Sequence, residues 1–305
     1  MSHLQFPLYF HEIYSSGLDR SARFPVDRYQ LIADNLAERD RGKQISWEIP
    51  RMANREEILL VHDKDYADRF LNHQLDSHEI RRIGLRPWKQ SIVERTLRLT
   101  GGALEAMDKV LTGGFVMAAN MAGGTHHAFR AEGAGYCIFN DLAICAEKAL
   151  HEKQINRILI LDLDVHQGDG TAQIFNGDDR VYTVSLHGKN NFPFRKQVSD
   201  WDVEFANGTE DEEYLQVLDD VLSKLSEMKF DLIFFQAGVD GLASDALGLL
   251  NLSRQGLEKR NLKVFEWRQS LGLPMVIFMG GGYAKPIENT VDAFSDLFLE
   301  VPRWL

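Results

Sequence analysis

Several features that would place the chain in a special class are scarce or absent. Only two cysteines, Cys137 and Cys145, occur among 305 residues, which is too few for a disulfide framework and fits a reducing compartment. No apolar run approaches the roughly 20 residues that span a bilayer. The first residues also lack the basic and apolar regions of a secretory signal. We therefore expect a cytoplasmic protein with no membrane partner.

An excess of basic residues is also missing. The formal net charge is −11, with 34 lysine and arginine residues against 45 aspartate and glutamate residues. Proteins that bind nucleic acid usually carry a basic stripe, so we expect no nucleic-acid partner. A cationic substrate or a lysine-bearing peptide remains compatible with this charge.

What remains is the composition of an ordinary folded domain. Hydrophobic residues make up 44% of the chain and charged residues 26%, as is typical of soluble globular proteins. No repeat, low-complexity segment or linker-like tract divides the sequence. We therefore expect residues 1–305 to form a single domain.

Apolar runs alternate with amphipathic helical patterns along the chain. The expected strands are residues 4–10, 45–50, 115–120, 158–166, 180–187, 230–238 and 274–283. The expected helices are residues 26–40, 91–111 with a break at two glycines, 140–154, 209–228 with a capping box, and 251–272, while residues 74–90 look irregular. Apolar strands that are separated by helices form parallel sheets covered on both faces. The sequence thus predicts an α/β fold, a single three-layer αβα domain with a mostly parallel sheet.

Five of the expected strands end in glycine-rich or polar segments. These segments are MAGGTHHAFRAEGAGYC, DVHQGDG, SLHGKNNFPF, AGVDGLASDALG and GGGY. Ligands of parallel α/β sheets bind beyond the carboxyl ends of the strands. We therefore expect all five segments to contribute to one functional site.

The stretch RILILDLDVHQGDGT, residues 157–171, changes from an aliphatic strand into a group of ionisable residues. Because strand side chains alternate between faces, Asp162, Asp164 and His166 should share one face. Buried carboxylates need a partner or a metal ion, so this pattern indicates a metal site. An acidic cap and turn without a metal is the alternative interpretation.

A third metal ligand is expected from another strand end. Asp245, in the loop after residues 230–238, is the candidate, although a helix cap or a solvated acid explains this residue alone equally well. Two carboxylates and one histidine leave an open coordination position, as in catalytic sites. Such a site suits Zn²⁺ and also accepts Fe²⁺ or Co²⁺.

Two histidines and a tyrosine are candidates for catalysis at the same edge. His126 and His127 follow two glycines, and Tyr283 follows three. Histidines in this position favour proton transfer, and an imidazole needs a carboxylate to orient it, for which Asp162 and Asp169 are available. The Tyr283 hydroxyl could stabilise an oxyanion. A plain turn or a phosphate loop is the alternative for the three glycines, which lack P-loop spacing.

The motifs GGTHHA, DLDVHQGDGT, VSLH, QAGVDGLASDALG and MGGGY, in this order, resemble those of the histone deacetylase family. The resemblance covers residues 120–285, and RFPVDRYQLI and LLVHDKDYADRFL extend it more weakly toward the bacterial and class IV branch. It implies the arginase/deacetylase fold. It also implies a zinc-dependent hydrolase that removes acyl groups, acetyl or longer, from lysine side chains of a protein or peptide.

The resemblance further implies a role for individual residues. The zinc ligands would be Asp164, His166 and Asp245. His127 would be the general base and acid, with His126 as its electrostatic partner.

The remaining implied roles are orientation, carbonyl polarisation and binding. Asp169 would hold His127, Asp162 would hold His126, and Tyr283 would polarise the amide carbonyl. The lysine chain would pass through a tunnel lined by Gly135, Tyr136 and Phe192. A monovalent cation, usually K⁺, would bind at Asp162, Asp164, His166, Ser185 and Leu186.

Three other functions remain open. A ureohydrolase on the same fold would need two metal ions, but Asp240 and Asp245 are five residues apart, which favours a single ion. A small acylated amine, such as an acetylpolyamine, could be the substrate of the same site. A non-catalytic module that binds acyl-lysine is the third. Tyr136 stands where phenylalanine is frequent in the family and leaves the acyl preference open.

Overall fold

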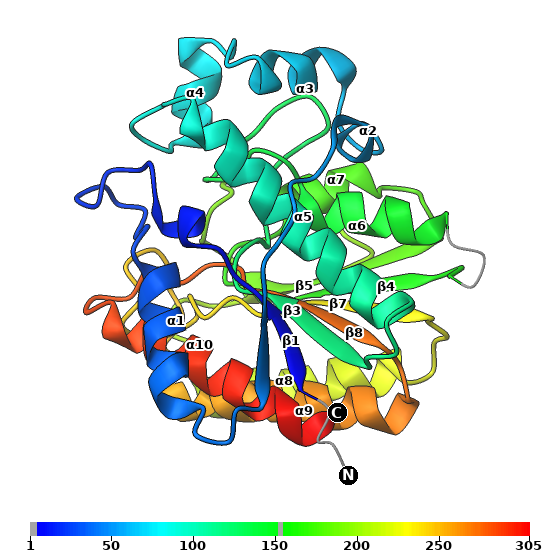
Figure 1. Ribbon diagram of the computed structural model, residues 1–305. Coiled ribbons are helices and arrows are strands. Elements are labelled where there is room, and N and C mark those ends of the chain that lie inside the picture. Colours follow the sequence, from blue (N-terminus) through cyan, green and yellow to red (C-terminus); the bar gives the residue numbers. More distant parts are fainter. Residues whose placement is uncertain (1–4, 152–154) are drawn as a thin grey trace.

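In the part of the chain that the computed structural model describes, one eight-stranded sheet, in which every strand pairing is parallel, forms the centre (Figure 1). The structure describes residues 5–151 and 155–305. The strand order is β2-β1-β3-β8-β7-β4-β5-β6. The strands are β1 (Phe6–Tyr9), β2 (Ile45–Glu48), β3 (Met117–Asn120), β4 (Ile158–Asp162), β5 (Val181–Gly188), β6 (Trp201–Phe205), β7 (Leu232–Gln236) and β8 (Met275–Phe278).

Helices cover both faces of the sheet and complete the three layers (Figure 1). The helices α1, α8, α9 and α10 pack on one face, and α5 and α6 pack on the other. The helices are α1 (Arg28–Arg39), α2 (Arg55–Ile58), α3 (Lys64–Leu71), α4 (Ser77–Ile83), α5 (Ser91–Leu111), α6 (Asp141–Leu150), α7 (Asp169–Ile174), α8 (Asp211–Leu225), α9 (Arg254–Leu271) and α10 (Glu288–Glu300), with 3₁₀ helices at Glu12–Ser15 and Val301–Trp304. The expected three-layer α/β domain is confirmed, and its sheet is wholly parallel.

Within the described ranges, no helix is both long and apolar enough to cross a membrane. Leu4, at the start of the first expected strand, and residues 152–154, at the end of an expected helix, lie outside the described residues.

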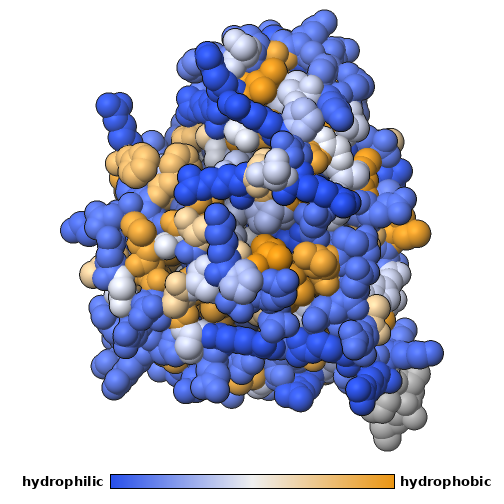
Figure 2. Space-filling model, turned by 90° about the vertical axis from the view of Figure 1, so that its left-hand side faces the viewer, coloured by the Kyte–Doolittle hydropathy of each residue, from blue (hydrophilic) through white to orange (hydrophobic). Residues whose placement is uncertain are grey.

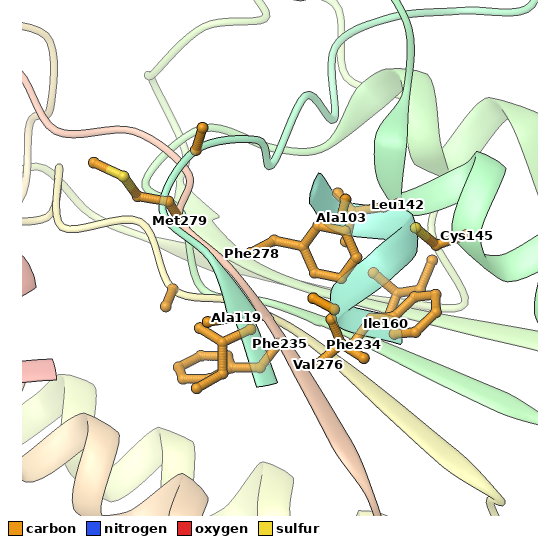
Figure 3. Close-up of a cluster of buried hydrophobic side chains, with 14 of the residues drawn as sticks. Ala103, Ala119, Leu142, Cys145, Ile160, Phe234, Phe235, Val276, Phe278 and Met279 are labelled. Carbon is orange, nitrogen blue, oxygen red and sulfur yellow. The ribbon is translucent and has the colours of Figure 1, made fainter. Parts of the chain in front are cut away.

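The central strands are buried on both faces. The rings of Phe234 and Phe278 lie 5.2 Å apart on the side of the sheet that also carries Leu142 of α6 (Figure 3). Phe235 points to the opposite face, where its ring lies 6.3 Å from that of Phe265 of α9. Burial on both faces explains why these strands are continuous apolar runs in the sequence.

The expected break in the helix at residues 91–111 is wrong, because α5 runs unbroken through Gly101 and Gly102. A Cβ atom at Gly101 would overlap the carbonyl oxygen of Arg51, and one at Gly102 would overlap the side-chain oxygen of Asn120. The two glycines therefore permit close packing of the helix rather than a change of direction.

Two further local predictions are wrong. Helix α8 begins at Asp211 without a side-chain cap, so Thr209 and Glu212 form no capping box. Residues 74–90 contain α4, which is capped by a reciprocal pair of hydrogen bonds between Asp76 and Glu79. The irregular appearance of this segment reflects its short length and its many polar residues.

Candidate active site

The turn that follows β4 positions Asp162, Asp164 and His166. The strand ends at Asp162, four residues earlier than expected, because the N–H groups from Asp164 to His166 donate to carboxylates instead of to a neighbouring strand. The N–H of Asp164 donates to Asp162 Oδ1 at 3.1 Å, and the N–H of His166 donates to Asp164 Oδ1 at 3.0 Å. These bonds fix a turn in which both acids and the histidine are buried.

Asp164, His166 and Asp240 lie close enough together to share a metal ion. Their candidate ligand atoms all lie within 4.8 Å of one another. His166 Nδ1 lies 3.0 Å from Asp164 Oδ1 and 3.0 Å from Asp240 Oδ2. Backbone N–H groups hold the carboxylates in place, since Val165 donates to Asp240 at 2.9 Å and Gly281 donates to Asp164 at 2.7 Å.

Asp245, the third ligand expected from the sequence, is not part of this group. Its Oδ1 accepts hydrogen bonds from the N–H groups of Leu247 and Gly248, both at 2.8 Å, and its Oδ2 accepts one from Tyr283 at 2.6 Å. Both oxygens are thus engaged by backbone donors. Asp164 likewise accepts backbone hydrogen bonds on both of its oxygens, from His166 and Gly281, so such bonds do not exclude a metal ligand. The expected role of Asp245 therefore stays a prediction, and the structure adds Asp240 as a second candidate for the third ligand.

The donor set of Asp164, His166 and Asp240 fits a divalent cation. Burial alone would lower the pKa of His166, but the two carboxylates more than offset it and raise the pKa to about 10. The group therefore attracts positive charge into a buried position, where carboxylates without a cation are costly. Two carboxylates and an imidazole are also the donor types of catalytic zinc sites.

His126 and His127 are each held by one carboxylate. His126 Nδ1 lies 2.7 Å from Asp162 Oδ2, and His127 Nδ1 lies 2.6 Å from Asp169 Oδ1. These are the two pairs that the resemblance implies. Because Nδ1 of each ring is engaged, the Nε2 atoms face inward and lie 3.1 Å apart.

The two histidines have opposite protonation tendencies. Burial would lower the pKa of His126, but Asp162 and Asp164 more than offset this effect and raise the pKa to about 9. Burial and the neighbouring charge of His126 lower the pKa of His127 to about 4. Near neutral pH, the pair therefore offers one protonated ring and one neutral ring side by side.

A cavity of about 460 Å³ leads from the surface to the histidines. The three expected tunnel residues, together with His127, His166 and Tyr283, are part of its lining. The ring of Phe192 lies edge-on to His127, with the two ring centroids 4.8 Å apart.

The backbone of the cavity wall comes close to His127. Gly135 and Tyr136 both adopt positive φ angles, of 53° and 68°, and a Cβ atom at Gly135 would overlap the His127 ring. Only glycine allows the backbone to pass this close to the imidazole.

Tyr283 lies on the wall of the same cavity, opposite the histidines. Its ring centroid is 6.0 Å from that of Tyr136 and 6.5 Å from that of His166. Its backbone is held by Asp245. The phenol thus stands beside the Asp164–His166–Asp240 group and next to the tunnel.

The residues expected to bind a monovalent cation lie side by side. Asp162 of β4 is directly opposite Ser185 of β5 in the strand register, and Leu186 follows Ser185 in the same strand. The N–H of Gly188 donates to the carbonyl of Val165 at 2.9 Å. This hydrogen bond and the pairing of β4 with β5 keep the turn after β4 close to β5.

Two buried arginines that support the site were not predicted from the sequence. Arg28 donates to the carbonyls of Gly280 and Gly282 at 3.2 and 2.8 Å, and thereby fixes the glycine segment before Tyr283. Arg260 of α9 donates to the carbonyls at the ends of β4 and β7. Both arginines lie in helical patterns that look amphipathic, and nothing in their spacing marks them as buried.

Comparison with known proteins identifies the relatives of this chain. A model of the histone deacetylase domain matches residues 22–297. An uncharacterized protein of Picosynechococcus sp. is 41% identical over 287 residues, which cover 94% of this chain and 95% of that protein. Histone deacetylase 2 of Arabidopsis thaliana is 31% identical and covers 77% of this chain, and histone deacetylase 8 of Xenopus tropicalis is 29% identical and covers 92%. The aligned region spans 63% of the Arabidopsis protein and 80% of the Xenopus protein.

Proposed function

Since this chain belongs to the histone deacetylase family, we propose that it is a metal-dependent hydrolase that removes acyl groups, acetyl or longer, from lysine side chains. One observation carries the proposal. The Asp164–His166–Asp240 group and two carboxylate-bound histidines lie together at the inner end of a cavity that opens to the surface. This is the arrangement that hydrolysis of an extended acylated amine requires.

Asp164, His166 and Asp240 would hold Zn²⁺, with Fe²⁺ or Co²⁺ as alternatives. A divalent ion bound there supplies a Lewis acid for the amide carbonyl and lowers the pKa of a water molecule. Asp240 takes the third position in this proposal because its ligand atom lies within 4.8 Å of those of Asp164 and His166. Asp245, which the resemblance implies, is the alternative third ligand, since backbone hydrogen bonds to both oxygens do not prevent Asp164 from serving as a ligand either.

His127 is the proposed general base and acid. Asp169 binds its Nδ1, which leaves Nε2 directed toward the inner end of the cavity to take a proton from the attacking water. His126, held by Asp162, supplies positive charge beside it. The proton returns to the amine as the C–N bond breaks, which yields a free lysine side chain and a carboxylate.

The walls of the cavity hold and polarise the substrate. The Tyr283 hydroxyl would donate to the carbonyl oxygen as negative charge develops there. Gly135, Tyr136 and Phe192 form a narrow wall against which the methylene chain of lysine would pack. Backbone oxygens around Asp162, Asp164 and His166, with Ser185 and Leu186, would hold a structural K⁺ ion below the turn.

A panel of substrates tests the proposed function. The purified protein is incubated with acetyl- to myristoyl-lysine peptides and with acetylated polyamines, with and without a chelator. We expect chelator-sensitive release of lysine from at least one peptide. Hydrolysis of acetylpolyamines alone would favour the small-amine alternative, and binding of peptides without hydrolysis would favour a non-catalytic module.

A further inference from the structure

The entrance of the tunnel has a charge opposite to that of the whole molecule. The chain carries a net charge of −11. Among the described residues that line the 460 Å³ cavity, Arg23 and Arg82 are basic and none is acidic. Both arginines are exposed. A substrate that enters the tunnel therefore passes two guanidinium groups, of which that of Arg82 is paired with Glu132.

The same charge continues along the outer side of α4. A shallower hollow there is lined by Arg81, Arg86 and Lys89, which are all exposed. Asp19 is the acidic residue of this lining, and its Oδ1 already accepts hydrogen bonds from the N–H and the hydroxyl of Ser21 at 2.8 and 2.7 Å. The cationic surface thus extends from the tunnel entrance across α4.

Most of these cations are available to a ligand. Arg82 forms an ion pair with Glu132 at 2.5 Å. Within residues 5–151 and 155–305, the ion pairs involve neither Arg23 nor the three basic residues of the hollow beyond α4. We call these four residues, Arg23, Arg81, Arg86 and Lys89, the basic rim.

Apolar side chains accompany the basic rim. Phe194 and Leu249 line the same cavity and are 88% and 41% exposed. Figure 2 shows this side of the molecule, where apolar patches lie among hydrophilic side chains. Exposed aromatic groups next to unpaired arginines are typical of surfaces that bind another chain.

We propose that the preferred substrates are acyl-lysine residues in protein segments that are rich in aspartate and glutamate. This inference rests on the proposed function and names the substrate class of that site. A cleft lined by one sign of charge concentrates ligands of the opposite sign and accelerates their association. Carboxylates that flank the acyl-lysine would meet the basic rim, whereas a polybasic segment would be repelled from it.

The test compares three acetyl-lysine peptides of equal length, with acidic, neutral or basic residues on either side of the acetyl-lysine. We expect kcat/KM for the acidic peptide to exceed that for the basic peptide by about tenfold or more at low ionic strength. The difference should shrink in 1 M salt, where the Debye length is about 3 Å. Equal values for all three peptides, or a preference for the basic one, would overturn the proposal.

Charge reversal at the rim gives an independent readout. In the double variant Arg23→Glu/Arg86→Glu, the preference should shift toward the basic peptide while turnover of the neutral peptide persists. Arg41→Glu/Lys43→Glu is the matched control, because it makes the same change of charge at two exposed residues of the loop between α1 and β2. A preference that stays with the acidic peptide in the double variant would contradict the assignment to these residues.

Failure of this inference can be told apart from failure of the proposed function. No hydrolysis of any acyl-lysine peptide would reject the function itself. Hydrolysis that is independent of the flanking charge would reject only the role of the basic rim. Free Nε-acetyl-lysine that is hydrolysed as efficiently as the acidic peptide would also overturn the proposal, since it lacks the flanking residues.

Discussion

Asp240 and Asp245 lie in one loop, five residues apart, and the structure gives them different partners. Asp240 faces His166, whereas Asp245 accepts three backbone hydrogen bonds and holds Tyr283. We predict that Asp240→Ala loses stoichiometric zinc, because a three-residue ligand set loses one donor. Asp245→Ala should keep the metal but lose turnover, because the Tyr283 backbone is released. Elemental analysis and turnover measured on both variants separate the two roles.

The opposite result would restore the sequence-based choice. If Asp245→Ala were metal-free and Asp240→Ala fully loaded, Asp245 would belong to the ligand set after all. The sequence places both acids just beyond a strand end, but it does not reveal which one lies beside His166. The path of the loop decides that, and it leaves no pattern in the sequence.

Tyr283→Phe tests the role of the phenol. The ring packs beside Tyr136 and His166, so loss of the hydroxyl should leave the fold and the metal content intact. We expect turnover to fall by roughly 10²–10³-fold, as for the removal of one oxyanion donor. Steady-state kinetics of the metal-loaded variant provide the measurement, and near wild-type turnover would exclude this role.

At the scale of elements, Glu57 connects α2 with its neighbours. Its carboxylate accepts hydrogen bonds from Arg51, from the N–H of Asn54 and from Lys148 of α6. Burial raises the pKa of Glu57, but these partners more than offset burial and lower it to about 2. The folded pKa is below the ordinary value of 4.5, so this stabilisation is complete above about pH 4.5 and is lost as the pH falls toward 2.

Glu57→Gln should therefore flatten the pH dependence of stability in acid. At pH 6 we expect the free energy of unfolding to fall by roughly 0.5–1 kcal/mol, and between pH 4.5 and 2 the difference from wild type should shrink. Urea unfolding at several pH values measures both quantities. Glu56→Gln, at the exposed neighbouring position of α2, is the control. A difference that is independent of pH would refute the assignment.

The accuracy of the sequence predictions also varies by element. The buried strands were recognised because a wholly parallel sheet produces continuous apolar runs. The end of β4 was placed too late, because side chains of Asp162 and Asp164 replace the ladder, which periodicity cannot detect. Helix α5 was expected to break at Gly101, since the sequence does not show that Arg51 packs against that glycine.

At the scale of the whole molecule, five strand ends were predicted to converge, and they do so because all the strands run parallel. The resemblance supplied the pairing of His126 with Asp162 and of His127 with Asp169, and both pairs are in contact. The buried arginines Arg28 and Arg260, which hold this edge together from two helices, could not be found, because long-range partners leave no local pattern.

Metal binding should stabilise the entire domain. Because a divalent ion would bind the folded chain at Asp164, His166 and Asp240, metal at 100 times its Kd would add about 2.7 kcal/mol to the free energy of unfolding. We expect a chelator to lower the Tm of the wild-type protein by several degrees and to leave that of Asp240→Ala unchanged. Equal shifts in both proteins would place the stabilising ion elsewhere.

The central claim is that one divalent ion at the end of β4 and β7 supports hydrolysis. The most direct measurement is titration of the metal-free protein with Zn²⁺ while hydrolysis of an acetyl-lysine peptide is followed. We predict that activity rises from the background to a maximum at one equivalent, and that Asp240→Ala shows no such rise. Activity that requires two equivalents, or that is present without any metal, would contradict the account.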